Sequence, residues 1–326
     1  MLPEVKRART CLIISASLIV LALILTIFGL GINLGIDFKG GQSLTYELGT
    51  EVTDEAGNTS FVRAVADQST LEGVLAKAGI VGGQVTIQGE DKSEVIIRLP
   101  ADAGTDDELA DIRSNLLNEI RSVEMDGTAV YADTRETATS SVSGTFSSTL
   151  VSNAVTAVLI AAVLMLIYIA IRFDLNSGIA AVFGLIHDVL MMLAFMVFLR
   201  WLIQMNSTFI AAMLTIVGYS INNTIVIFDR IRENAKKLPG VPRASVVSRS
   251  VKECLGRTIN TTLTTLVTIV LLYILGVDSI REFALPIIVG ILSGVYSANL
   301  INGYVWAWLE ERRLARKTGK KPVQEN

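Results

Sequence analysis

The sequence predicts a polytopic α-helical membrane protein with six membrane-spanning helices and a small α+β domain between the first and second of them. Hydrophobic residues make up 51% of the 326 residues and charged residues only 18%, a composition typical of membrane proteins. Six runs of about 20 mostly apolar residues are each long enough to cross roughly 30 Å of hydrocarbon. About a hundred residues after the first run show short strand and helix patterns instead.

The predicted spans are 11–34, 151–171, 179–199, 207–228, 258–276 and 283–309. Basic residues precede the first span, as they do in signal peptides. Its apolar core from Leu12 to Leu34 is too long for such a peptide, and no small-x-small cleavage site precedes Asp37. We therefore expect this span to be a retained anchor.

Lysine and arginine gather in three segments, which predicts the orientation of the chain. These are the N-terminus (1–10), the loop 229–257 and the tail 310–326. Because cytoplasmic loops hold an excess of positive charge, these segments and both termini are expected in the cytoplasm. The acidic segment after span one is then extracytoplasmic.

The extracytoplasmic domain, 35–133, is predicted to be ferredoxin-like. Its expected order is strand, helix, strand, strand, helix, strand. The strands are expected at 42–48, 84–88, 94–99 and 128–133. One helix is expected at 69–78, and the other is opened by a capping box of Thr105 and Glu108 and has an apolar stripe from Leu109 to Ile120. An insertion at 49–67 has no assigned structure. Residues 134–150 are rich in Ser and Thr, so we expect a lead-in to span two that is either a passive linker or a hinge.

Polar residues inside the spans are the candidate functional site, because each costs a few kcal/mol near the bilayer centre. At 1.5 Å rise per residue, those of spans three, four and five come to similar depth, and we expect them to share one polar cluster. The members are His187, Asp188, Ser220, Asn222, Asn223, Thr224, Arg257, Thr261 and Thr262.

Two interpretations remain open for these residues. The Thr-rich stretch of span five is typical of hydrogen bonding between neighbouring helices. Asp188 must be protonated, paired or hydrated, so it either handles protons or makes a local structural bond. The chain has a single histidine and two cysteines, and no cluster of ligands suggests a metal site.

A mixed-charge run ends span four and contains Asp229, Arg230, Arg232 and Glu233. Helical spacing allows pairing within the run, for example of Asp229 with Arg232. The run is either a solvated helix end or a cytoplasmic docking surface or gate beneath the polar cluster.

Three stretches together resemble the SecF family, the small subunits of the bacterial SecDF protein-export complex. They are 35–41 (Gly-Ile-Asp-Phe-Lys-Gly-Gly, with Asp37, Gly40 and Gly41), 187–189 (His-Asp-Val) and 218–234. The resemblance covers the whole layout. It implies a location in the bacterial plasma membrane and a SecD partner, with which this chain would form a pseudo-symmetric twelve-helix bundle related to the resistance-nodulation-division transporters. It also implies that the pair uses the proton gradient to help the SecYEG channel draw preproteins outward.

One residue departs from the family pattern, which commonly reads Ser-x-Asn-Asp-Thr where this chain has Asn223. An amide cannot carry a proton at physiological pH. The proton carrier is then an acid of the SecD partner, which we favour, or Asp188, or else the coupling does not use protons.

Other function classes lack their motifs. No phosphate loop of the form G-x-x-x-x-G-K-[ST] is present, and a single histidine does not suit a metalloprotease. We expect no catalysis, no cofactor and no nucleic-acid partner. The alternatives that remain are a proton-driven exporter of lipids or drugs and a purely structural translocon subunit.

Overall fold

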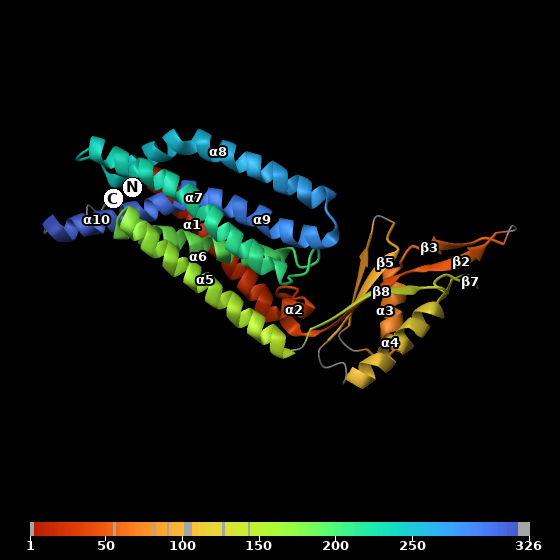
Figure 1. The fold of residues 1–326 in the computed structure, drawn as a ribbon. Coiled ribbons are helices and arrows are strands. Elements are labelled where there is room, and N and C mark those ends of the chain that lie inside the picture. Colours follow the sequence, from red (N-terminus) through yellow and green to blue (C-terminus); the bar gives the residue numbers. More distant parts are fainter. Residues whose placement is uncertain are drawn as a thin grey trace. The chain divides into compact units, whose positions relative to one another are not determined.

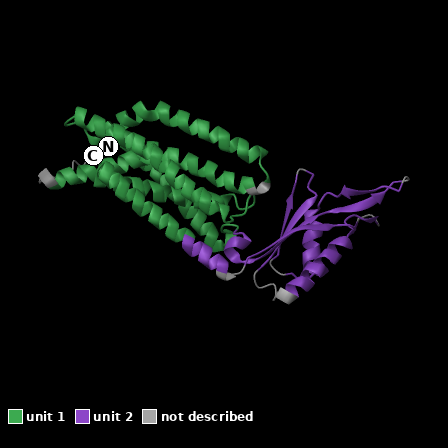
Figure 2. Cartoon of the chain, in the orientation of Figure 1, with its two compact units in different colours: residues 1–33, 154–326 green, residues 34–153 purple. Residues whose placement is uncertain are grey.

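The computed structural model describes residues 3–54, 57–80, 83–89, 91–100, 106–125, 128–142 and 144–318. The chain divides into two compact units (Figure 2): unit 1 holds residues 1–33 and 154–326, and unit 2 holds residues 34–153. Within the described residues, six helices are long and apolar enough to cross a membrane. The predicted architecture of six spans and one α+β domain is thereby confirmed.

Unit 1 is a bundle of long helices that lie side by side (Figure 1). The first is α1 (Pro3–Leu25), which continues as a π-helix over Thr26–Leu30. The next are α5 (Gly144–Arg172), which belongs to unit 1 from Ala154 onward, α6 (Leu175–Phe198), α7 (Thr208–Lys237) and α8 (Arg243–Leu275). The last is α9 (Asp278–Ser297), which continues through the π-helix η2 (Ala298–Asn302) into α10 (Gly303–Thr318).

Three of these spans form the centre of the bundle. In α6, α7 and the α9–α10 span, 56%, 44% and 61% of the most apolar window is buried, against 11% in α1, α5 and α8. The peripheral helices instead expose large apolar side chains such as Ile13, Leu159 and Leu263. A helix that exposes apolar residues to its surroundings suits a lipid environment or a helical partner.

Unit 2 contains a four-stranded antiparallel sheet with the order β4-β5-β1-β8. Its strands are β1 (Gly41–Glu47), β4 (Gln84–Gln88), β5 (Glu94–Leu99) and β8 (Arg135–Val142), and its helices are α3 (Gln68–Lys77) and α4 (Asp106–Arg121). If the sheet strands are counted one to four along the chain, the order is 2-3-1-4. This is the predicted ferredoxin-like arrangement.

The core of unit 2 follows from the alternation of its strands. Val95, Ile97 and Leu99 of β5 are buried, whereas the residues between them are only partly so. Because alternate side chains point to one face of a sheet, this face packs on apolar stripes of the two helices. The stripes contribute Leu71, Val74, Leu75, Leu116 and Ile120.

The predicted C-terminal end of the outer domain, residue 133, was wrong. Residues 134–150 are not a lead-in: Arg135–Val142 forms the edge strand β8, paired with β1, and α5 begins at Gly144. The strand predicted at 128–133 is reduced to β7 (Thr128–Ala129), which pairs with β6 (Glu124–Met125) outside the main sheet. The unassigned insertion contains a hairpin of β2 (Gly49–Thr53) and β3 (Thr59–Arg63).

The predicted basic segments are also more helical than expected. The loop 229–257 consists mostly of the ends of α7 and α8, which leaves only residues 238–242 between them. The predicted N-terminal segment 1–10 lies in α1 from Pro3 onward. The tail continues α10 as far as Thr318, and its last eight residues lie outside the described residues.

Candidate functional site

Asp188 is the centre of the polar cluster and is fully buried on α6. His187 Nδ1 lies 3.0 Å from Asp188 Oδ1, and the Ser293 hydroxyl donates to the same oxygen at 2.8 Å. The hydroxyls of Ser220 and Ser297 donate to Oδ2, the latter at 2.8 Å. A carboxylate offers about four acceptor sites, so each oxygen of Asp188 has two partners. These partners come from α6, α7 and α9.

The arrangement depends on close approach between the central helices. A Cβ at Gly294 would lie 3.2 Å from the Ser220 Cβ, and one at Gly290 would lie 2.5 Å from Ile216. Glycine therefore lets α9 approach α7 where the serine hydroxyls reach the carboxylate, as small residues commonly do between membrane helices. Ser293 and Ser297 are four residues apart, so they face the same side of α9.

His187 connects the cluster to the first span. Its ring stacks on Tyr296 with the centroids 6.1 Å apart, and the Tyr296 hydroxyl donates to the Cys11 carbonyl of α1 at 2.7 Å. Among the described residues, the other ring nitrogen, Nε2, is buried without a hydrogen-bond partner. The imidazole thus has one polar atom engaged by Asp188 and one that is not engaged.

A second polar group lies on α7 and the π-helix of the last span. Asn302 donates to the Thr224 hydroxyl at 3.0 Å. The Asn302 amide packs so closely on Gly184 that a Cβ at residue 184 would lie 2.3 Å from the amide nitrogen and oxygen. Asn223 is buried, and its Nδ2 has no partner within the described part of the chain. Single π-helical turns are frequent at functional sites.

The structure does not bring the polar residues of span five to Asp188. Thr262 is buried and accepts a 3.3 Å hydrogen bond from Tyr219, whereas Arg257 and Thr261 are exposed. Asn222 of span four is also exposed. The expected cluster of spans three, four and five is therefore made by spans three, four and six.

Sequence reasoning missed the contributions of span six, namely Ser293, Ser297 and Asn302. The signal was present as Ser and Asn residues at helical spacing in the run from Gly290 to Asn302. It is weak because serine is common in membrane helices and carries no charge.

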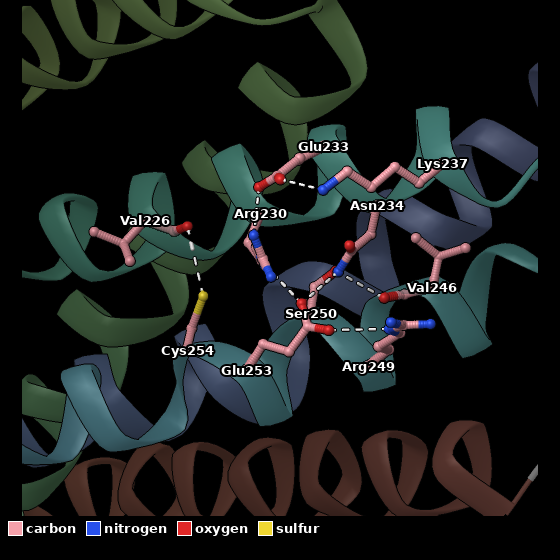
Figure 3. Close-up of polar contacts among 10 residues, drawn as sticks. All are labelled: Val226, Arg230, Glu233, Asn234, Lys237, Val246, Arg249, Ser250, Glu253 and Cys254. Atoms are coloured by element: carbon pink, nitrogen blue, oxygen red, sulfur yellow. Dashed lines mark hydrogen bonds and ion pairs between the residues drawn. The ribbon is translucent and has the colours of Figure 1, made fainter.

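The mixed-charge run at the end of α7 forms an ion-pair network with α8 (Figure 3). Arg230 contacts Glu233 on its own helix and Glu253 on α8, the latter at 2.6 Å. Asn234 is buried and donates to both Ser250 and Glu253, at 3.0 and 2.8 Å. The network thus fastens the end of α7 to α8.

Two charged residues of the run lie outside this network. Asp229 is exposed and does not pair with Arg232, and Arg232 donates to the Arg172 carbonyl at 3.3 Å instead. The pairing expected between Asp229 and Arg232 was wrong, because Arg232 reaches the Arg172 carbonyl. Pairing within the run does occur, between Arg230 and Glu233 three residues apart.

Asp37, Gly40 and Gly41 lie in unit 2, where the short helix α2 (Ile36–Lys39) turns into β1. Gly40 and Gly41 have φ values of 76° and 121°, and both are buried. A side chain is strained at such angles, so the pair of glycines permits a sharp turn. The described residues contain no group of three or more His, Cys, Asp or Glu that could hold a metal ion.

Comparison with known proteins identifies the family. The model for the C-terminal part of the protein export membrane proteins SecD/SecF matches residues 122–312, and the model for the SecD/SecF GG motif matches residues 26–52. The chain belongs to the SecD/SecF family. The GG-motif match covers the turn at Gly40 and Gly41, and the larger match covers every helix that contributes to the Asp188 cluster except α1.

Individual relatives agree with this membership. The SecF translocase subunit of Alicyclobacillus acidocaldarius is 33% identical over 96% of this chain and 94% of its own length. The SecDF translocase subunit of Thermus thermophilus is 35% identical over 90% of this chain, but the match spans only 37% of that longer protein. The crystal structure of Thermus thermophilus SecDF, a translocon-associated membrane protein, matches with a TM-score of 0.75 at 32% identity, over 95% of this chain and 39% of the other.

These matches make the chain a SecF-type translocase subunit, a multi-pass membrane component of protein transport rather than an enzyme.

Proposed function

We propose that this SecF-type subunit pairs with a SecD-type partner in the bacterial plasma membrane to form a twelve-helix bundle, and that the pair helps SecYEG export preproteins by using the proton gradient. Both termini then lie in the cytoplasm. SecDF relatives support the pairing, because this chain matches only 37% of one of them. The remaining length leaves room for a SecD-type half.

A polar face on α7 and α8 is the observation that carries this proposal. Contacts of Tyr219 with Thr262 and of Val226 with Cys254 show that the two helices run antiparallel, so Asn222 lies level with Thr258. Asn222 and the neighbouring Arg257 and Thr261 are exposed. Polar residues of membrane helices face a bundle interior or a water-filled cavity, and a second subunit would provide either.

We assign the proton-carrying acid to the partner, beside this polar face. Asn223 lies one residue from Asn222 and cannot titrate. The four hydrogen-bond partners of Asp188 suit an ionised carboxylate that holds α6, α7 and α9 together. A hydroxyl can also turn to accept, so protonation of Asp188 remains the competing route for the coupling.

The connection between the two units supports transmission of motion to the outer domain. One residue separates the end of β8, an edge strand of the domain's sheet, from the start of α5, and the boundary between the two units falls within α5. A movement of α5 would pull directly on this strand rather than on a slack linker. The hinge interpretation of this segment is therefore the one we propose.

Depletion of the chain tests the proposal against its rivals. We expect release of secreted proteins to slow while drug tolerance is unchanged. Normal secretion with increased drug uptake would instead support an exporter of lipids or drugs. If secretion slows to the same extent when the proton gradient is collapsed beforehand, the chain is a purely structural translocon subunit.

A further inference from the structure

A pocket of about 220 Å³ lies where α5 meets α6 and where α7, α8 and α10 come together. In Figure 1 the end of α7 and the start of α8 lie at the end of the bundle at which α1 begins. The lining of the pocket combines an apolar floor, which includes Phe228 and Trp306, with charged side chains. The charged members are four cations and two acids: Arg232, Lys236, Arg243, Arg313, Asp174 and Glu310.

The acids leave much of the positive charge without a partner. Glu310 is nearly buried and is already bound by Arg313 at 2.9 Å and by the Asn176 amide at 2.7 Å. Asp174 accepts a hydrogen bond from Ser177. The other three cations, Arg232, Lys236 and Arg243, therefore share the pocket with a single acid, Asp174, that is not already in an ion pair among the described residues.

Arg243 gives the most specific sign that an anion binds here. Its Nη1 is buried and has no hydrogen-bond partner in the described part of the chain. A buried donor on a charged group is costly to leave unpaired. Arg243 is also the first residue of α8, where the helix dipole disfavours a cation. An anion in the pocket would relieve both penalties.

We propose that this pocket binds the phosphate group of an anionic membrane lipid. Guanidinium groups bind phosphate oxygens with the geometry that their forked donors require, and basic pockets between membrane helices suit anionic lipid head groups. The apolar floor suits the part of a lipid next to its phosphate. Apolar side chains are also exposed on either side of the junction of α5 and α6, namely Ile171 and Leu175.

Native mass spectrometry of the purified full chain tests this proposal. The chain is incubated with micelles that contain phosphatidylglycerol or zwitterionic phosphatidylcholine, and retained lipid is counted. We expect phosphatidylglycerol to be retained preferentially and Arg243→Gln to weaken that retention about tenfold. Arg249→Gln is the matched control, because it removes the same charge from α8 at a residue whose ion pair is with Glu253.

Equal retention by wild type, Arg243→Gln and Arg249→Gln would overturn the proposal. If Arg243→Gln fails to fold, Lys236→Gln replaces it, because Lys236 is exposed and its loss should still weaken retention severalfold. Inorganic phosphate is added in a separate arm. Failure of phosphate to release the lipid supports a lipid site, whereas release at equimolar phosphate would overturn the lipid assignment in favour of free phosphate.

Discussion

Asp188 on α6 and Ser297 on α9 are 109 residues apart in the sequence and are joined by a 2.8 Å hydrogen bond from the serine hydroxyl to the carboxylate. Ser220 of α7 donates to the same oxygen. One carboxylate therefore connects the three helices at the centre of the bundle. We therefore expect this acidic side chain to contribute to the stability of unit 1.

Asp188→Asn should lower the free energy of unfolding by about 3 kcal/mol, because the amide loses the charge assistance of the carboxylate and two of the four partners must turn to accept from its NH2 group. Thermal unfolding of the purified chain in detergent measures the loss. Asp229→Asn is the control, since Asp229 is exposed. Equal stability of the two variants would contradict the role of Asp188 as the connection between these helices.

Gly184→Ala should displace Asn302 and break its hydrogen bond to Thr224, because the new Cβ would lie 2.3 Å from the Asn302 amide. Overpacking of this kind costs about 2 kcal/mol. Gly218→Ala is the matched control, since nothing lies within 4 Å of a Cβ there. Unfolding in detergent should separate the two variants, and a Gly184→Ala protein as stable as Gly218→Ala would show that the contact is not required.

Asn223→Asp should make export depend on external pH in a way that the wild-type chain does not, because a carboxyl titrates and an amide does not. Release of a secreted reporter from cells at several pH values measures the effect. Asn223→Ser is the control, as it is polar but cannot titrate. Identical pH profiles for all three proteins would indicate a sealed, structural position.

Asp67 should make the first turn of α3 sensitive to acid. Hydrogen bonds from Thr70 and Ser69 hold the pKa of this carboxyl below its ordinary value of 3.8, so the ionised form stabilises the folded state. This contribution is complete above about pH 4 and is lost as the pH falls through the lowered pKa. Hydrogen exchange of the α3 amides, corrected for the intrinsic pH effect, should show the loss in wild type and not in Asp67→Asn.

The spans and most of unit 2 could be predicted because their apolar residues follow the periods of helix and strand. Strands 84–88 and 94–99 occur at the predicted residues. β8 was missed because its sequence, Arg-Glu-Thr-Ala-Thr-Ser-Ser-Val, has almost no apolar alternation and most of it is exposed. An edge strand is held largely by backbone pairing, which leaves little trace in the side chains.

Only those site residues could be predicted whose burial in a membrane costs much free energy. Asp188 could be singled out because a buried carboxylate requires partners. Its partners Ser293 and Ser297 could not, because a serine hydroxyl can bond its own helix as easily as a neighbour. Depth alone also grouped Arg257 with Asp188, although Asp188 is buried among the central helices and Arg257 is exposed.

The most direct test of the account is photocrosslinking from the polar face of α7 and α8 in intact cells. A photoreactive amino acid at residue 222, in place of Asn222, should form an adduct with a SecD-type protein. The same group at residue 159, in place of Leu159 on the exposed apolar surface of α5, should not. Adducts of equal yield from both positions, or none from residue 222, would contradict the claim that this face meets a SecD-type partner.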